Sequence, residues 1–430
     1  MSPVLFNLYL ADLSRQLSVK CPSLQLGNTS INHLLFADDL ILFGDGLSGS
    51  MNSLIKVTSD YCATWKLRIA PGKTKIIKYG GGPGVWRLPR SPQQGCDIIK
   101  EFPFAKYLGI ELEPRSFKYC KRRVTKVLSI AREYAAALRH LRTDSLDRVD
   151  TALALWKSCA ISSILYASEV IHLTATDLKA LDKIQDGVAR QICQVDNSTA
   201  GVSSLIETGL IPISILVKVR KLKFYLGLRA LGDERLVKQA LVENSGSNWS
   251  SPFMKEIREV LEDCDENEVD PDTILIDMTT DFYLSELERC KKSLCIFPRN
   301  YDIGNKSAFL NDSWQCGVLC SFRAGNAQLG NRSPAPLGVQ VKLCPLCDEL
   351  GKQELVNECH VICSCPFLEA TRRAIGLTKI LETMSKVYKT TNKVTLTRIF
   401  LGEDLASPPE LRSRAIMLER LRTKWYNLVK

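Results

Sequence analysis

The sequence lacks the features of a membrane-spanning or secreted chain. None of its apolar runs approaches the roughly 18 residues needed to cross a bilayer. Met1 is followed at once by Ser2 and Pro3, without the basic segment that opens a secretory signal. We therefore expect an intracellular protein, in the nucleus or the cytoplasm, with no membrane partner. The 16 cysteines follow no regular disulfide spacing, so they are expected to be reduced and mostly buried thiols.

The composition excludes a disordered or fibrous chain. Of the 430 residues, 45% are hydrophobic and 24% are charged, which is typical of a folded protein of about two to four domains. The net charge is only +10, so its distribution matters more than its size. Residues 115–142 carry nine Lys or Arg against one Glu, which favours a polyanionic partner. Residues 256–281 carry eleven acids against one Arg, so this segment should not lie on nucleic acid.

The N-terminal part has the pattern of a mixed α/β structure. Residues 31–43 are two short apolar runs separated by Asp38 and Asp39, which predicts a β-hairpin with the acids at its bend. Glycine and proline crowd residues 80–98, which predicts an exposed loop. Residues 104–112 predict another strand-like run.

The remainder of the chain is mainly helical in its pattern. After residue 114, apolar residues recur every three or four positions with basic residues between them, which predicts an amphipathic basic helix. Residues 243–252 are polar and predict a linker, and a last helix is expected to begin with Ser407 as its cap. Further helices are expected at about 146–170, 175–194 and 213–242.

The Asp38–Asp39 pair is the first candidate for chemistry. Two carboxylates between apolar strands need stabilisation, because a buried unpaired ion loses several kcal/mol of hydration. A divalent cation would provide it, and so would water at an exposed turn. For an Asp-Asp dipeptide taken alone, the solvated bend is the commoner case.

The surrounding residues favour the cation, because they resemble a known family. Leu35 to Asp39 (LFADD) resembles the [FY]-x-D-D turn of reverse transcriptases, and Ser2 to Leu13 resembles the helix ahead of that turn. Trp65 to Ile69 with Lys73 to Lys75 is similar to the family's next motif, and Lys106 to Ile110 is similar to its primer-grip hairpin. These four segments also follow one another in the order that is typical of the family. More narrowly, the chain resembles the polymerase of a non-LTR (LINE-type) retrotransposon, including the helical region at 150–230.

The resemblance implies nucleotidyl transfer by two Mg²⁺ ions held about 4 Å apart, with an RNA template and a DNA target or primer as partners. Asp38 would be the main metal ligand of the pair, with Asp39 beside it. The basic helix would be a thumb-like element over the template-primer. The residues implied in nucleic-acid binding are Lys73, Lys75, Tyr107, Leu108, Gly109, Lys121, Arg122, Arg123 and Lys126. A P-loop is excluded, because the position five before Gly72 is Leu67 rather than glycine.

The family pattern also requires a further metal-binding Asp, the fingers and a Gln-Gly pair ahead of the segment that here opens the sequence. We therefore expect a truncated copy of such an element, or a gene model begun at an internal methionine. Because one side of the metal site would then be missing, we expect the polypeptide not to polymerise alone.

A second candidate site has the pattern C-x2-C-x12-H-x4-C, formed by Cys344, Cys347, His360 and Cys365. This spacing can close a tetrahedral zinc site of three thiolates and one imidazole. Cys363 or Cys359 remains an alternative to Cys365, although Cys365 followed by proline matches the C-terminal finger of the resembled family. Such structural zinc could contribute on the order of 10 kcal/mol to folding. Ahead of it, Arg323 and Gly325 echo an Arg-x-Gly segment and are candidates for an RNA contact.

These patterns predict an α+β fold: a partial palm subdomain with an antiparallel sheet and helices, a helical thumb and connector, and a small zinc-binding C-terminal region. The alternative to a polymerase fragment is a non-enzymatic, zinc-dependent nucleic-acid-binding protein derived from such an element. The expected domains are 1–113 (partial palm), 114–242 (thumb and connector), 243–310 (linker and acidic helical segment), 311–375 (zinc-finger-like region) and 376–430 (C-terminal helices).

Overall fold

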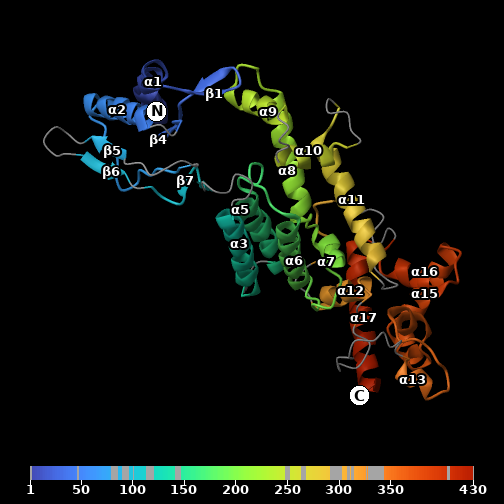
Figure 1. The fold of residues 1–430 in the computed structure, drawn as a ribbon. Coiled ribbons are helices and arrows are strands. Elements are labelled where there is room, and N and C mark those ends of the chain that lie inside the picture. The colour runs from blue at the N-terminus through green and yellow to red at the C-terminus, as the bar shows by residue number, and fades with distance from the viewer. Residues whose placement is uncertain are drawn as a thin grey trace. The chain divides into compact units, whose positions relative to one another are not determined.

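The computed structural model divides the chain into two compact units, each formed by separate stretches of sequence (Figure 1). The first comprises residues 1–126, 167–173 and 220–268, and the second comprises residues 127–166, 174–219 and 269–430. The structure describes residues 2–45, 48–78, 86–89, 96–99, 101–112, 121–140, 147–246, 252–262, 268–290, 303–307, 310, 314–325, 327, 343–403 and 407–429. The expected five-part division of the chain stays a prediction.

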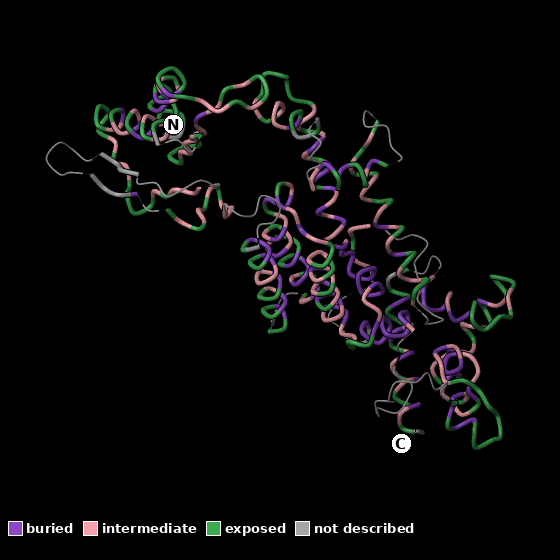
Figure 2. Tube along the Cα trace, viewed as in Figure 1, coloured by how far each residue is buried: buried purple, intermediate pink, exposed green. Residues whose placement is uncertain are grey.

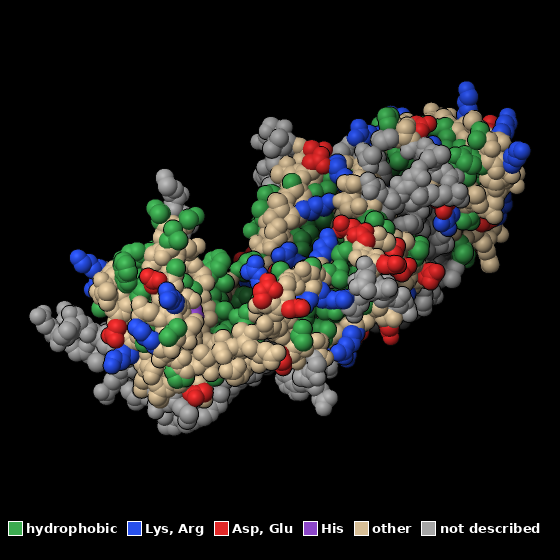
Figure 3. All heavy atoms as spheres, turned by 90° about the horizontal axis from the view of Figure 1, so that it is seen from above, with side chains coloured by type: hydrophobic (Ala, Val, Ile, Leu, Met, Phe, Trp, Pro, Cys, Tyr) green, Lys and Arg blue, Asp and Glu red, His purple; other side chains and the backbone are tan. Residues whose placement is uncertain are grey.

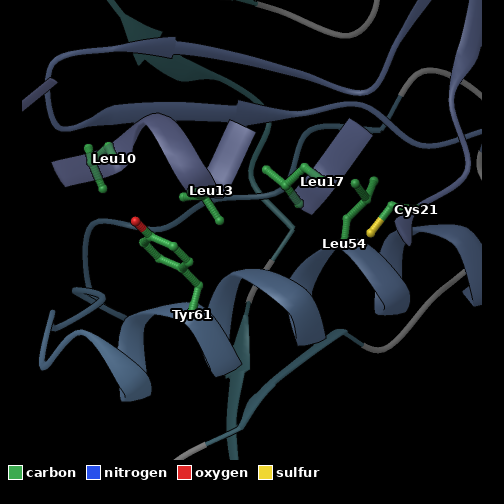
Figure 4. Close-up of a cluster of buried hydrophobic side chains, with 6 residues drawn as sticks. All are labelled: Leu10, Leu13, Leu17, Cys21, Leu54 and Tyr61. Carbon is green, nitrogen blue, oxygen red and sulfur yellow. The ribbon is translucent and has the colours of Figure 1, made fainter. Parts of the chain in front are cut away.

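The core of the first unit lies between helix α1 (Ser2–Lys20) and helix α2 (Ser48–Thr64). Leu10, Leu13 and Leu17 recur at helical spacing and therefore share one face of α1. Figure 4 shows this face meeting Leu54 and Tyr61 of α2. The hairpin of β3 (His33–Phe36) and β4 (Asp39–Leu42) adds Leu35, Leu40 and Leu42 to the same cluster. The predicted hairpin at 31–43 is thus confirmed, and it is anchored by its apolar face.

The strands pair only locally. In the described residues they form four separate two-stranded antiparallel sheets, rather than one continuous palm sheet. The expected strand at 104–112 is a hairpin, because a turn at Leu108 and Gly109 divides it. The prediction of a loop at 80–98 was wrong in part, because two short strands pair there. The remaining strands are β1 (Leu24–Leu26) with β2 (Thr29–Ile31), β5 (Trp86–Pro89) with β6 (Cys96–Ile99), and β7 (Ala105–Tyr107) with β8 (Ile110–Leu112).

Helices follow where the periodicity predicts them, with shorter bounds. The basic helix is α3 (Lys121–Arg139). The helix predicted at 213–242 is divided at 230–235, where Gly232 and Asp233 interrupt it. Its second part extends into the expected linker as far as Gly246. The helices are α4 (Arg148–Leu155), η1 (Trp156–Ile161), α5 (Ser162–Leu165), α6 (Ala175–Ile192), α7 (Gly201–Thr208), α8 (Ile213–Arg229), α9 (Leu236–Gly246), α10 (Pro252–Val260) and α11 (Pro271–Arg289).

The C-terminal part of the second unit is organised around a long helix, α17 (Pro408–Val429). Ser407 begins it as predicted, since the backbone N–H and the hydroxyl of Ser407 both donate to the Glu410 carboxylate at 2.8 Å. Ala415, Leu418, Leu421 and Trp425 are fully buried and mark its inner face. The shorter elements are α12 (Trp314–Arg323), α13 (Pro345–Asp348), η2 (His360–Ser364), η3 (Pro366–Leu368), α14 (Glu369–Ala374), α15 (Leu377–Val387) and α16 (Lys393–Phe400).

The described elements, many helices with small antiparallel sheets, confirm the α+β class. No single described helix is long and apolar enough to cross a bilayer, although α7 and α8 together pass that test as a pair bent by 58°. In the folded chain, residues 202–208 of α7 are buried in the protein, as Figure 2 shows in purple.

Candidate functional site

The acidic pair lies at the bend of the β3–β4 hairpin. Phe36 pairs with Asp39 across the two strands, so Ala37 and Asp38 form the two-residue loop. Ala37 has φ 51°, a left-handed conformation that is strained for a residue other than glycine. Asp38 and Asp39 are both exposed. Water therefore reaches their charges, and a cation would reach them by the same route.

The same pair does not by itself form a two-metal site. Magnesium requires near-octahedral oxygen ligands, and holding two ions requires carboxylates on both sides of them. Within the residues that the structure describes, only one group of three or more His, Cys, Asp or Glu side chains brings its ligand atoms together, and it lies elsewhere in the chain. No further acid joins Asp38 and Asp39 in that part of the chain. The two-ion arrangement therefore does not fit the described residues.

A polar relay fixes the hairpin to α1. The buried side-chain amide of Asn32 donates to the Leu17 carbonyl at 2.9 Å, which leaves its oxygen as an acceptor 2.7 Å from Nδ1 of His33. Nε2 of His33 lies 2.7 Å from the Ser14 hydroxyl. Burial lowers the pKa of His33, which favours the neutral ring with its proton on Nδ1. Nothing in the spacing of His33 predicted this relay.

The predicted primer-grip hairpin lies close to the acidic pair. The pKa of Tyr107 is raised by burial and, to a smaller extent, by the negative charge of Asp39. The charge of Asp39 therefore acts on the phenol of Tyr107. Leu108 and Gly109 form the loop with φ 46° and 80°, which corresponds to the hairpin turns that need positive φ at both positions. The other three segments that carry the resemblance also meet, since Leu35 of the turn and Leu67 of the next motif both pack against the buried face of α1.

Lysine and arginine side chains flank an aromatic pair in the same unit. The Lys75 ammonium lies 4.9 Å from the ring centroid of Phe102 and 5.3 Å from that of Phe104. The Arg122 guanidinium lies 4.0 Å from the Phe104 centroid, within cation–π range. Lys75 and Arg122 both remain exposed, as does Lys73. Their charges are therefore close together and accessible to an anion.

The basic side chains at the start of α3 differ in their exposure to solvent. Lys126 and Arg122 are exposed, whereas Arg123 is only 5% exposed. A buried guanidinium has no access to a phosphate in this conformation, so the exposed cations are the better candidates. The side chain of Lys121 lies outside the described residues. Nucleic-acid binding by these residues stays a prediction.

The second predicted site forms a compact cluster. The ligand atoms of Cys344, Cys347, His360 and Cys365 all lie within 4.8 Å of one another, and all four residues are buried. Cys344 and Cys347 flank the start of α13, while His360 opens η2 and Cys365 ends it. A hydrogen bond of 2.7 Å from the Cys344 N–H to the Glu354 carbonyl folds the intervening loop back. Residues distant in sequence therefore converge as the spacing predicts.

The donor set fits zinc. Burial and the neighbouring thiols Cys344 and Cys365 raise the pKa of Cys347 to about 12, because thiolates so close together repel one another. A divalent cation removes this penalty and deprotonates the sulfurs. Nδ1 of the buried His360 has no hydrogen-bond partner, while Nε2 lies 3.4 Å from the Cys347 sulfur. Four protein ligands leave no position for a substrate, so the bound ion would cross-link the fold.

The two alternative cysteines point elsewhere. The Cys363 sulfur lies 3.3 Å from the Thr397 hydroxyl on α16. The side chains of Cys359 and Cys363 are hydrogen-bonded to each other. Neither of these two sulfurs belongs to the converging group. Among the open alternatives for the fourth position, the geometry selects Cys365.

The structure does not favour Arg323 as the candidate RNA contact. Arg323 is 3% exposed, forms an ion pair with Glu207, and donates to the Leu401 carbonyl at 2.6 Å. Its guanidinium therefore holds α12, α7 and the end of α16 together inside the second unit. The sequence carried no signal of this role, because Glu207 is far away along the chain.

The first unit contains a buried charge, Lys221, that the sequence analysis did not predict. Lys221, only 2% exposed, donates to Glu256 at 2.5 Å. His172 lies 2.8 Å from the same carboxylate. These two contacts fix α10 to α8 and to the 167–173 segment.

A comparison with protein families agrees with the arrangement of the first unit. Residues 1–119 match the family model described as reverse transcriptase (RNA-dependent DNA polymerase). The matched range contains α1, the acidic hairpin and the β7–β8 hairpin, which are the elements that the structure brings together. The N-terminal part of this chain is therefore similar to the reverse transcriptase domain of RNA-dependent DNA polymerases.

Proposed function

We propose that the chain belongs to a non-LTR retrotransposon polymerase: palm elements, a basic thumb helix, a helical connector and a zinc-binding region. The observation that carries this proposal is the combination of a reverse transcriptase domain at 1–119 with the Cys344–Cys365 cluster on one chain. In such a polymerase, magnesium would neutralise the charge that develops during nucleotidyl transfer. Asp38 and Asp39 are the carboxylates available to bind it, and the charge of Asp39 acts on the Tyr107 phenol.

We further propose that the 430 residues alone do not polymerise. The Asp pair supplies one side of a metal site, and no third acid joins it within the described ranges. Without opposed carboxylates, two cations so close together cannot be held against their mutual repulsion. Positioning is most of the catalysis in phosphoryl transfer, so a partial site should lose nearly all of the rate.

Primer extension tests this proposal. With poly(rA)/oligo(dT), dTTP and Mg²⁺, we expect synthesis by the purified chain to equal that of its Asp38→Ala variant, at the level of a no-enzyme blank. Asp60→Ala, which removes an exposed acid of α2, serves as the matched control. Robust synthesis that Asp38→Ala abolishes and Asp60→Ala leaves unchanged would overturn the proposed inactivity.

A second candidate function is zinc-dependent nucleic-acid binding without catalysis. The observation that favours it is the group of exposed cations around Phe104, where Lys75 and Arg122 lie at most 9.3 Å apart because both contact one ring. Two charges at such a distance, about one Debye length, can act on one phosphate backbone. On the face seen in Figure 3, other Lys and Arg side chains are scattered among Asp and Glu, so overall charge identifies no interface.

Salt dependence tests this second function. RNA affinity should fall roughly 10-fold or more between 50 and 200 mM salt, because each neutralised phosphate releases counterions. Arg122→Gln should weaken binding and reduce the slope, whereas Lys56→Gln, a change of an exposed cation on α2, should not. Binding that is absent, or that does not respond to salt, would contradict it.

A further inference from the structure

Helix α11 is anchored to the second unit through Thr279 and Tyr283. Thr279 and Tyr283 are fully buried, and the Tyr283 hydroxyl donates to the Leu210 carbonyl at 3.0 Å. Asp270 caps the helix by accepting from the N–H groups of Asp272 and Thr273. The helix is thus well formed and anchored from within, so its outer face is a fixed surface.

The outer face of α11 carries an apolar stripe. Ile276 is 50% exposed and Leu284 is 45% exposed. At 3.6 residues per turn, Ile276, Thr280 and Leu284 fall within an arc of about 80°. The Thr280 hydroxyl donates to the Ile276 carbonyl of its own helix at 2.9 Å, so its hydrogen-bonding need is met internally. These three residues form what we call the α11 stripe.

Acidic side chains border the α11 stripe along one side. By the same rotation, Asp277, Glu288 and Asp281 follow Leu284 around the helix, and all three are exposed. None of them forms an ion pair in the part of the chain that the structure describes, where Glu286 instead pairs with Arg289. On the other side of Ile276, the buried Tyr283 comes next, so there the stripe adjoins the face that packs on the second unit. The stripe is therefore apolar with a row of unneutralised negative charge.

This charge decides what can cover the α11 stripe. Nucleic acid and anionic membranes are repelled by the acids. A second copy using the same face would bring Asp277, Asp281 and Glu288 toward their own counterparts, which disfavours a symmetric dimer there. The complementary surface has apolar residues at helical spacing beside Lys or Arg. Helices with these features dock on apolar stripes by their i, i+3 and i+4 positions.

We propose that the α11 stripe is a docking surface for a basic amphipathic helix of a partner protein. Leu or Ile side chains of the partner cover Ile276 and Leu284, and its Lys or Arg side chains pair with Asp277, Asp281 and Glu288. The proposal does not depend on polymerase or nucleic-acid activity, because α11 contributes no residue to either candidate site.

The test uses two synthetic 18-residue peptides of identical Leu and Lys composition. One places Leu at helical spacing, and the other has the same residues scrambled so that no apolar face forms. With the full chain, fluorescence anisotropy should show at least 10-fold tighter binding of the patterned peptide. Ile276→Asp with Leu284→Asp should remove this preference, and Asp277→Asn with Asp281→Asn should weaken binding of both peptides.

Val387→Asp is the matched control, because it places an acid at an exposed apolar position on another helix, α15. It should leave both affinities unchanged. Far-UV circular dichroism checks that each variant is folded. Equal affinity for the two peptides, or loss of the preference in Val387→Asp to the same extent as in the α11 variant, would overturn the proposal.

Discussion

Replacing Cys365 by serine should release a zinc ion and unfold the region around the cluster. The wild-type chain, purified under reducing conditions without chelator, is expected to carry about one zinc per chain. The binding free energy of a structural zinc, on the order of 10 kcal/mol, becomes folding free energy when the site exists only in the folded state. Elemental analysis measures the metal, and thermal unfolding with and without chelator measures its contribution.

The neighbouring Cys363 offers a closely matched control. Cys363→Ser changes the same atom two residues away, but its sulfur lies against Thr397 rather than in the converging group. We expect this variant to retain its zinc and most of its stability. A wild-type protein with little zinc, or equal zinc loss in Cys363→Ser and Cys365→Ser, would remove the metal site.

The expected effect is large because little else holds this region together. Near the cluster, α13, η2 and η3 are short, from three to five residues each, so they cannot be stable as isolated helices. All three pack against α17. Without the ion, the three buried thiols and the imidazole would lose the common bonds that link them. Loss of the metal should therefore also expose the inner face of α17.

How far the sequence could predict the two candidate sites depended on how local their signals were. The Cys344–Cys365 spacing and the two apolar runs around Asp38 specify local geometry, so the cluster and the hairpin were found where expected. Burial of Arg123 and Arg323 depends on helices that are distant in the sequence, and no local pattern encodes it. The division of residues 104–112 into a hairpin could have been predicted from Gly109, which tolerates positive φ.

Charge alone was the least reliable guide, because its meaning depends on burial. Arg323 and Glu207 show this most clearly. Arg323 is 3% exposed and Glu207 is similarly buried. The Arg323 guanidinium also reaches the Leu401 carbonyl, and the Ser307 hydroxyl donates to Glu207 at 2.5 Å. Their mutual attraction offsets the cost of dehydrating both ions only while both are present.

Arg323→Ala should therefore destabilise the second unit by about 3–5 kcal/mol, because it leaves the Glu207 carboxylate buried without its partner. Urea unfolding followed by circular dichroism measures the change in free energy. Arg373→Ala is the control: Arg373 also pairs with a glutamate, Glu369, but its side chain is 71% exposed. Exposed pairs contribute about 0–1 kcal/mol, so this variant should stay close to the wild type.

A double variant separates the ion pair from simple loss of packing. Arg323→Met with Glu207→Leu removes both charges and keeps most of the buried volume, so it should be more stable than Arg323→Ala alone. Glu207→Leu alone should be strongly destabilising, because it strands the buried guanidinium. Two results would contradict a stabilising ion pair between α7 and α12. In one, Arg323→Ala lowers the free energy of unfolding no more than Arg373→Ala does; in the other, the double variant loses as much free energy as the two single variants together. Recovery in the double variant would show that the cost in each single variant comes from the charge left without its partner.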